Sequence, residues 1–335
     1  MLVRIPNWLG DALMATPVYY NLSLNLDEEI YLFGPPSIVE LFKFFPKVKV
    51  LPFYKENFKK NLETLKPFRT QRGLLLTNSF SSAWLFFRAR IRERLGYASD
   101  LRRFLLTKAV KVPSQKMHQR DYYLYLIKEL GFKIKEKALK LYLGEEIFEK
   151  VEKLFKKVGL RLEESFVILA PGAAYGLAKR WPKDYYKILA EKLSKKGYQL
   201  LVVGSSSEKE LGEFIKEGYP KGIYNLCGKT DLLTVSGIFF LSKLIISNDS
   251  GLMHLAACLE KPQIAIFGST DPELTGPLNP KAKIIKKEFN CSPCFERECP
   301  YRHYNCLKNI TPEEIFQIAE TLLETFEKFN CLKKI

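Results

Sequence analysis

Three short segments of the chain place a carboxylate or a cation beside glycine and other small residues. They read IPNWLGDALMATP at 5–17, APGAAYGLAKRWP at 170–182 and NDSGLMHLAA at 248–257. A carboxylate in such a place can take a proton from a substrate. Lysine, arginine and the free N–H groups at the start of a helix can bind phosphate. The segments favour a site for an anionic ligand, although capped helices and solvated loops use the same residue types.

Asp11 is the candidate proton acceptor of the first segment. It follows Gly10, which permits close backbone approach, at the expected start of a helix. Aspartate is favoured at helix N-caps, so an ordinary cap is the competing interpretation. The functional alternative is a carboxylate exposed at the carboxyl end of the first strand, where it acts as a general base.

Lys179 and Arg180 follow a loop rich in glycine and alanine. The N–H groups of such a loop, together with two neighbouring cations, suit a diphosphate. The competing interpretation is a solvated loop before a helix that begins with proline, because cations are common in a chain with 53 lysines and arginines.

The third segment begins a helix at Ser250 and Gly251, whose free N–H groups and dipole attract an anion. Asp249 would repel phosphate, so we expect it to accept hydrogen bonds from sugar hydroxyls. His254 shares a helix face with Ser250, although a single histidine on a helix is more often structural. No predicted strand is followed by a dinucleotide-binding or P-loop glycine pattern, which argues against dehydrogenases and P-loop enzymes.

The elements that must position these segments alternate between strand and helix in two runs. Strands are expected at 2–5, 30–33, 47–51 and 73–77, and again at 166–170, 198–203, 244–247 and 263–267. This pattern predicts an α/β protein with two doubly wound, Rossmann-like domains facing a central cleft. The expected domains are 1–160 and 161–310, with a last helix in 311–335 that packs back on the first domain.

Local signals mark several helices. One helix is expected over Asp11–Leu24 and another over His118–Leu130. Ser207 and Glu210 have the spacing of a capping box, and Thr311 precedes a proline where the last helix begins.

The composition favours anionic partners, because 53 lysines and arginines against 37 acids give a net charge of +16. The first residues do not form a signal peptide, and no window reaches the length of a membrane helix. A cytoplasmic protein is therefore expected.

The three segments, in this order, resemble the signature blocks of the ADP-heptose:lipopolysaccharide heptosyltransferases, glycosyltransferase family 9. TNSFSSAW at 77–84 and HQRDYYLYL at 118–126 resemble the heptosyltransferase II branch of that family. The resemblance implies a GT-B fold, with the acceptor bound by the first domain and the donor by the second. It also implies an inverting transfer from ADP-L-glycero-D-manno-heptose without metal or cofactor.

The resemblance assigns roles to single residues. Asp11 matches the catalytic base, and Lys179 matches the lysine that contacts the donor diphosphate. The donor-binding D-[TS]-G-x-x-H block is matched by Asp249, Ser250, Gly251 and His254, and the other expected donor contacts are Trp8, Gly10, Ala173, Arg180 and Leu252. The implied acceptor is a heptose of the lipopolysaccharide inner core, at the cytoplasmic face of the inner membrane, with no role for nucleic acid. An enzyme of this family that uses another nucleotide sugar is the nearest alternative.

Residues 84–111 form the expected acceptor and membrane surface. They interleave aromatic residues with arginines, as interfacial anchoring requires; the arginines are Arg88, Arg90, Arg92, Arg94, Arg102 and Arg103. The competing interpretation is a solvated basic face over core aromatics, since long cationic side chains often cover apolar surface.

Four cysteines lie close together near His303, namely Cys291, Cys294, Cys299 and Cys306. The C-x-x-C start is typical of a structural zinc or iron–sulfur site, but the later spacing is irregular. Disulfides are the alternative, and no metal is expected in catalysis. The cluster and the positive charge also fit a rival class, a zinc-containing nucleic-acid-binding protein, in which the acid of NDSG has no natural role.

Overall fold

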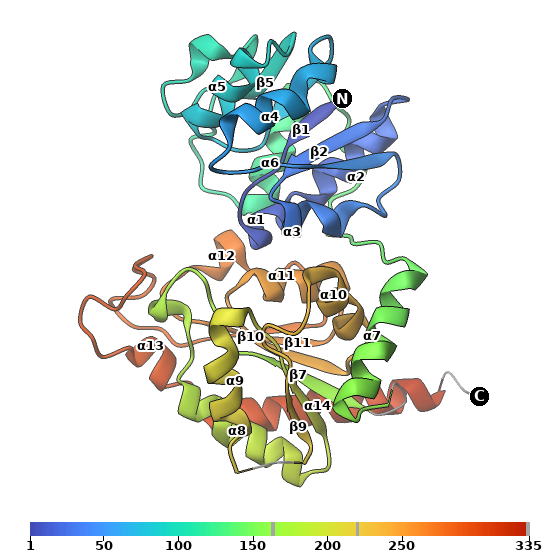
Figure 1. Ribbon diagram of the computed structural model, residues 1–335. Helices are drawn as coiled ribbons and strands as arrows, with labels where there is room; N and C mark the ends of the chain where they lie inside the picture. Colours follow the sequence, from blue (N-terminus) through green and yellow to red (C-terminus); the bar gives the residue numbers. More distant parts are fainter. Residues whose placement is uncertain (162–164, 219–220, 333–335) are drawn as a thin grey trace. The chain divides into compact units, whose positions relative to one another are not determined.

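The protein consists of two compact units, Met1–Tyr142 and Leu143–Ile335. The computed structural model describes residues 1–161, 165–218 and 221–332, and Figure 1 shows the course of the chain. The boundary comes before the expected residue 160, because α7 (Glu145–Val158) packs on α10 (Leu232–Leu241) of the second unit.

The first unit contains a six-stranded parallel sheet in the order β3-β2-β1-β4-β5-β6. The strands are β1 (Leu2–Arg4), β2 (Ile30–Gly34), β3 (Val48–Pro52), β4 (Arg72–Leu75), β5 (Glu93–Tyr97) and β6 (Lys108–Val110). The helices are α1 (Leu9–Met14), α2 (Thr16–Asn25), α3 (Pro36–Val39), α4 (Phe58–Leu65), α5 (Phe80–Arg88) and α6 (Gln119–Glu129). The chain fills the sheet on one side of β1 and then on the other, so the topological switch point lies between β1 and β4.

The helix expected over Asp11–Leu24 is in fact two helices, α1 and α2, which meet at Ala15. Pro17 explains the break, because it has no N–H to donate to a carbonyl of α1 but fits the first turn of a new helix. The break leaves α1 as a short helix with Asp11 in its first turn.

The second unit contains another six-stranded parallel sheet, in the order β12-β11-β10-β7-β8-β9. The strands are β7 (Phe166–Ala170), β8 (Gln199–Val202), β9 (Ile223–Asn225), β10 (Leu244–Asn248), β11 (Gln263–Phe267) and β12 (Ala282–Lys286). Its remaining helices are α8 (Lys183–Lys195), α9 (Lys209–Lys216), α11 (Gly251–Cys258), α12 (Pro272–Thr275), α13 (Asn305–Lys308) and α14 (Pro312–Leu332). The switch point lies between β7 and β10.

Alternate residues of β7 face opposite layers of helices. Val167 and Leu169 belong to the core that α8 covers, whereas Phe166 packs edge-on against Phe155 of α7. A parallel sheet buried on both faces explains the uninterrupted apolar runs in the sequence. The two sheets confirm the predicted pair of doubly wound α/β domains.

Helix α14 begins at Pro312, as predicted. Its residues Ile315, Ala319 and Leu323 are part of the core of the second unit, beside α8. Packing of the helix on the first domain stays a prediction. None of the helices in the described ranges is both long and apolar enough to cross a bilayer.

The capping box expected at Ser207 and Glu210 is formed instead by Ser205 and Glu208. The backbone N–H of Ser205 donates to Glu208 Oε2 at 2.7 Å. Both pairs have the same spacing, and only the position of the turn after β8 decides between them.

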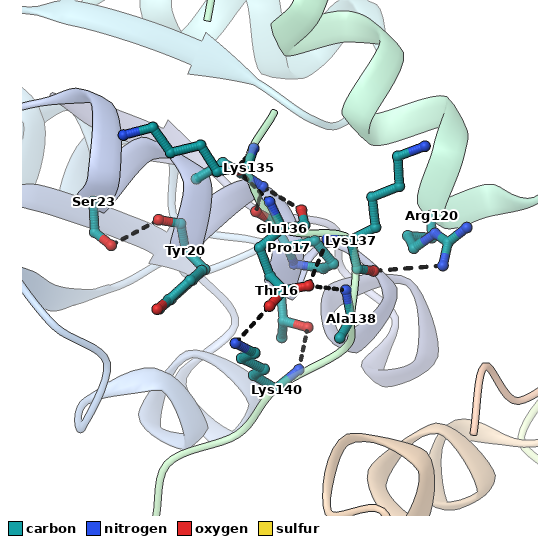
Figure 2. Close-up of polar contacts among 11 residues, drawn as sticks. Thr16, Pro17, Tyr20, Ser23, Arg120, Lys135, Glu136, Lys137, Ala138 and Lys140 are labelled. Carbon is teal, nitrogen blue, oxygen red and sulfur yellow. Dashed lines mark hydrogen bonds and ion pairs between the residues drawn. The ribbon is translucent and has the colours of Figure 1, made fainter. Parts of the chain in front are cut away.

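Residues 133–140, here called the strap, run along α2 and complete the first unit (Figure 2). Asn21 of α2 is the buried anchor of the strap. Its Nδ2 donates to Glu136 O at 2.6 Å, and its Oδ1 accepts from the N–H of Lys135 at 2.7 Å. Asn25 bonds both backbone groups of Lys133: its Nδ2 donates to Lys133 O, and its Oδ1 accepts from the N–H of Lys133, both at 2.9 Å.

The Glu136 side chain stabilises the turn of the strap, as Figure 2 shows. Its Oε2 lies 2.7 Å from Lys140 Nζ, and its Oε1 accepts from the N–H groups of Lys137 and Ala138. The Lys140 hydrogen bond, followed by these backbone donors, lowers the pKa of Glu136 to about 2.

Replacing Asn21 by Ala should destabilise the first unit by about 2 kcal/mol, since a buried polar group left unpaired costs roughly 1–3 kcal/mol. Hydrogen exchange should show faster exchange at Lys135 and Glu136, and the thermal transition should move to lower temperature. Thr64→Ala, which removes a hydrogen bond at the exposed surface of α4, is the matched control. Unchanged exchange in the strap would show that Asn21 does not hold it.

Candidate functional site

The candidate residues of the first unit follow the carboxyl end of β1, beside the switch point of the sheet. Ligands of doubly wound domains bind at such points. Arg4, the last residue of β1, fixes the loop: its buried guanidinium donates to Asn7 Oδ1 and lies 3.8 Å from the centre of the Phe53 ring. Burial lowers the pKa of Arg4 to about 9, so it remains charged at neutral pH. The loop ends at Trp8, whose side chain is 56% exposed.

Asp11 is the third residue of α1, and Trp8 is the N-cap, so the capping interpretation of Asp11 is wrong. The Asp11 side chain is partly exposed. Its Oδ1 accepts a hydrogen bond of 3.2 Å from the hydroxyl of Tyr123 on α6. Burial, reinforced by the negative charge of Asp11, raises the pKa of Tyr123 well above its usual value. The hydroxyl therefore keeps its proton and orients the carboxylate, which is placed to take up a proton.

In the second unit, Lys179 and Asp249 form a buried ion pair beyond the carboxyl ends of β7 and β10. Lys179 Nζ lies 2.5 Å from Asp249 Oδ2, and the two side chains are 12% and 3% exposed. The hydroxyl of Thr270, which follows β11, donates to the same oxygen at 2.5 Å. Asp249 thus has partners within the protein, whereas the sequence favoured sugar hydroxyls as its partners.

Asn248 connects the two strand-end loops of the second unit, a role that its sequence context did not reveal. Its Oδ1 accepts from the N–H of Trp181 and the hydroxyl of Tyr186, both at 3.1 Å. Its Nδ2 donates to Pro171 O at 2.7 Å. Because Pro171 begins the loop that carries Lys179, this fully buried amide holds that loop beside β10. In the sequence, this role could have been indicated only by the position of Asn248 at the end of an apolar strand, directly before Asp249.

The start of α11 contains a buried hydroxyl that the described residues leave without a hydrogen-bond partner. It is the Oγ of Ser250, the N-cap of α11. The Oγ of Ser269, which follows β11 and lines the cavity beside the four cysteines, is a second atom of this kind. His254 lies one turn into α11 and is 3% exposed. A buried polar atom without a partner costs free energy, so the Ser250 hydroxyl marks a place where a polar ligand would be stabilised.

The loop after β7 is held by a second set of contacts. Arg180 Nε donates to the carbonyl of the buried Ala173 at 3.1 Å. The carboxylate of Glu208 lies so close to Gly172 that a Cβ there would collide with it. The sequence marked neither Glu208 nor Thr270 as a site residue, because the fold alone brings them to this loop.

The two units thus carry different chemical functions. The first presents an oriented carboxylate at the start of α1. The second combines a lysine, the N-terminus of a buried helix and the unpartnered Ser250 hydroxyl, which suits a phosphate-bearing ligand. Gly10 in α1, and Gly251 and Leu252 in α11, are half-buried at these two helix starts.

Residues 60–305 match the sequence profile of Glycosyltransferase family 9 (heptosyltransferase), which covers more than half of the chain. The chain belongs to glycosyltransferase family 9. The rival interpretation of this transferase as a nucleic-acid-binding protein is therefore wrong.

Relatives of this family 9 transferase indicate its branch. Lipooligosaccharide heptosyltransferase 2 of Haemophilus influenzae is 33% identical over 342 residues, which cover 96% of this chain and 99% of the relative. The protein of the same name from Campylobacter jejuni is 30% identical over 332 residues, covering 96% and 98%. These relatives confirm the predicted heptosyltransferase II branch and a transferase of lipopolysaccharide biosynthesis.

Solved structures of the family agree with this assignment. The structure of E. coli ADP-heptose lps heptosyltransferase II matches with a TM-score of 0.84 at 28% identity, covering 97% of this chain and 99% of that one. A family 9 transferase from Veillonella parvula has the same fold, with a TM-score of 0.84 at 20% identity and 97% coverage of both chains. The predicted GT-B type of fold is confirmed.

The arginines expected on one surface of the transferase have different environments. Arg88, Arg90, Arg92 and Arg103 are exposed, as predicted. The prediction is wrong for Arg102, which is fully buried, donates to Tyr97 O at 3.0 Å and has its pKa lowered to about 10 by burial. The partly buried Arg94 also has a structural role, because its guanidinium donates to the carbonyls of Ile91 and Leu105.

The four clustered cysteines of the transferase are free thiols around His303. Cys291 Sγ lies 3.9 Å from His303 Nε2, and Cys299 Sγ lies 3.9 Å from His303 Nδ1. Across residues 1–161, 165–218 and 221–332, no three His, Cys, Asp or Glu side chains are arranged to hold a metal ion. This part of the chain therefore shows neither the disulfides nor the metal-ligand geometry that the spacing suggested.

Cys299 should react with iodoacetamide at lower pH than Cys306. Partial burial raises the pKa of Cys299, but the N–H groups of residues 301–304 hydrogen-bond to the thiolate and bring the pKa below its usual value. Burial and the neighbouring thiols raise the pKa of Cys306. Since the thiolate is the reactive form, mass spectrometry over a pH series should detect Cys299 labelling first; earlier labelling of Cys306 would contradict this order.

Proposed function

We propose that the transferase moves heptose from ADP-L-glycero-D-manno-heptose to a heptose of the lipopolysaccharide inner core, with inversion at the anomeric carbon. The relatives support the reaction class, since they are named lipooligosaccharide heptosyltransferase 2 and ADP-heptose lps heptosyltransferase II. The observation that carries the proposal is the buried Lys179–Asp249 pair beside the unpartnered Ser250 hydroxyl.

The donor diphosphate is assigned to the start of α11. The first N–H groups of that helix, the Ser250 hydroxyl and the Lys179 ammonium are the donors that a diphosphate requires. Asp249 and Thr270 hold Lys179 ready, so little ordering remains to be done when the donor binds. The Glu208 carboxylate, an acceptor beside Gly172, suits a hydroxyl of the nucleotide.

The remaining expected donor contacts extend this assignment along two loops and one helix. Ala173 and Arg180 belong to the loop after β7, and Leu252 and His254 to α11. Trp8 and Gly10 lie beside Asp11 at the start of α1, where they would meet the sugar end of the donor.

The proposed chemistry is a single displacement. A hydroxyl of the acceptor attacks the anomeric carbon on the face opposite ADP. The new C–O bond forms as the bond to the β-phosphate oxygen breaks, and ADP leaves with the bonding electron pair. Asp11, oriented by Tyr123, takes the proton of the hydroxyl. Lys179 and the N–H groups of α11 stabilise the charge that grows on the leaving diphosphate, so no step in this scheme draws on a metal.

We place the reaction at the cytoplasmic face of the inner membrane, where lipid chains hold a lipopolysaccharide core acceptor. The test uses the purified full chain with ADP-L-glycero-D-manno-heptose and lipopolysaccharide truncated after its first heptose. Mass spectrometry should detect one added heptose, and NMR should show the anomeric configuration inverted relative to the donor. A higher kcat/KM with another nucleotide sugar would overturn the donor assignment and leave the family assignment unchanged.

A further inference from the structure

We propose that one face of the first unit docks on a bilayer rich in anionic phospholipid. This face, here called the docking surface, consists of exposed apolar and aromatic residues, the half-buried Trp84 between them, and exposed arginines. Its members are Phe80, Trp84, Phe87, Arg88, Arg90, Arg92, Leu101, Arg103 and Phe104. The inference builds on the proposed function, because a lipid-anchored acceptor requires the enzyme to work at a membrane surface.

A row of aromatic rings runs along α5 at the molecular surface. Phe80 stacks on Trp84, with ring centres 6.4 Å apart, and Trp84 stacks on Phe87 at 5.7 Å. Phe104 extends the row, 6.1 Å from Phe80. Phe80, Phe87 and Phe104 are 38%, 43% and 73% exposed. Aromatic residues in contact with one another normally bury this area in a core. Three exposed rings joined through the half-buried Trp84 therefore indicate an interaction surface.

The tip of the docking surface is an exposed leucine. Leu101 is 91% exposed, and both it and Asp100 have the positive φ values that place them at a sharp turn, 53° and 49°. The Asp100 carboxylate accepts from the N–H of Phe80 at 2.6 Å. The one acid at the tip is thereby engaged at the start of α5, and the leucine points into solvent beside the aromatic row.

Buried Arg102 makes this tip rigid. Its Nε donates to Tyr97 O at 3.0 Å, and its Nη1 donates to the carbonyls of Thr77 and Ser79, at 2.5 and 3.3 Å. These bonds join the tip to the ends of β4 and β5. Leu101 and Phe104 are therefore held in exposed positions before any lipid binds. Few side chains then need to become ordered on contact with the bilayer.

Exposed arginines surround the other end of the aromatic row. Arg88 lies over the Trp84 ring at 5.5 Å. Beside it is a hollow of about 390 Å³ lined by Phe87, Arg88, Arg90, Ile91, Arg92 and Arg94. This lining contains no acidic residue, and guanidinium groups bind phosphate in pairs of hydrogen bonds. The combination of apolar anchors and phosphate-binding cations matches the interface of an anionic bilayer.

The apolar residues of the docking surface favour lipid over single-stranded nucleic acid, the other kind of partner that binds surfaces of aromatic and basic residues. The Phe80, Trp84 and Phe87 faces stack on one another, so they are not free to hold bases between them. Leu101, the most exposed member, cannot stack on a base at all, whereas it can enter the acyl region of a bilayer.

The test is co-sedimentation of the full chain with vesicles of phosphatidylcholine alone or mixed with an equal part of phosphatidylglycerol, without donor or acceptor. The wild-type protein should bind the mixed vesicles at least tenfold more tightly than the neutral ones, and less tightly in high salt. The triple change Arg88→Glu, Arg90→Glu and Arg92→Glu should remove this preference. The double change Leu101→Ser and Phe104→Ser should weaken binding by about tenfold or more, in high salt as well.

Matched controls come from exposed residues of the second unit. Lys153→Glu, Lys157→Glu and Lys283→Glu reverse the same number of charges, and Ile188→Ser with Phe240→Ser removes comparable apolar groups. Circular dichroism and the thermal transition verify folding of every variant. Equal loss of binding in the controls, no preference of the wild type for anionic vesicles, or tighter binding to single-stranded RNA would overturn the proposal.

A second measurement separates docking from catalysis. The Leu101→Ser, Phe104→Ser variant should transfer heptose to a de-acylated, water-soluble acceptor at the wild-type rate but more slowly to acceptor embedded in vesicles. Equal losses with both acceptors would overturn the docking role. Vesicle binding requires no turnover, so a wrong donor or base assignment would leave its result unchanged.

Discussion

The Asp11→Asn variant is expected to lose about 10²–10⁴-fold in kcat, the usual contribution of a general base, while its affinity for ADP stays near that of the wild type. The amide has nearly the shape of the carboxylate but cannot take up the proton of the acceptor hydroxyl. The Tyr123 hydroxyl, which donates to Asp11 Oδ1, can still donate to an amide oxygen. Steady-state transfer rates and ADP-induced thermal stabilisation measure the two properties separately.

Asp27→Asn is the matched control for this variant. Asp27 is a fully exposed aspartate in the same unit, 4.0 Å from Lys47, and its change should leave kcat unaltered. Wild-type turnover in Asp11→Asn would remove Asp11 from the mechanism. An equal loss of ADP stabilisation would instead show that the variant disturbs donor binding.

The Lys179→Met variant is expected to lose both stability and donor binding. Asp249 is 3% exposed, and removing its cation leaves a buried carboxylate that still accepts a hydrogen bond from the Thr270 hydroxyl but has lost its ion-pair partner. Breaking one side of a buried ion pair typically costs about 3–5 kcal/mol, which should appear as a lower thermal midpoint. The donor diphosphate would also lose its nearest assigned cation, so ADP should stabilise the variant much less.

The double variant Lys179→Met, Asp249→Asn separates these two effects. Without a buried charge, its thermal midpoint should recover toward that of the wild type. Its stabilisation by ADP should remain weak, because the ammonium is still missing. Wild-type stabilisation by ADP in the double variant would contradict the assignment of Lys179 to the diphosphate.

The sequence predicted the buried strands well because parallel strands covered on both faces are continuous apolar runs. It missed β5 and β6 for the same reason. Glu93 and Arg94 in β5 and Lys108 in β6 are charged, and these residues interrupt the apolar runs. β6 is the edge strand of the first sheet and β5 lies next to it. The stretch expected to be a basic surface therefore also contains two strands of the first sheet, and Arg94 of β5 has a structural role.

The candidate residues were found more readily than their partners. Asp11, Lys179 and Asp249 stand beside glycine at strand ends, where local sequence is informative. Tyr123, which orients Asp11, is 112 positions away from it, and Thr270 reaches Asp249 from another strand. Such pairings depend on strand order, which local patterns do not encode. Arg102 shows the opposite error, since its neighbours in sequence are exposed while its own side chain is buried.

The contacts of the strap can form only late in the synthesis of the first unit. Asn21 leaves the ribosome early, but Lys135 and Glu136 follow 114 and 115 positions later, and Lys140 reaches Thr16 across 124 positions. When β6 has emerged, the whole sheet of the first unit is available, yet the buried amide of Asn21 has only Pro17 O as a partner and still lacks the groups that the strap supplies. At synthesis rates of roughly 5–20 residues per second, this interval lasts a few seconds. During it the first unit is most open to proteases and chaperones, and the arrival of the strap ends that exposure.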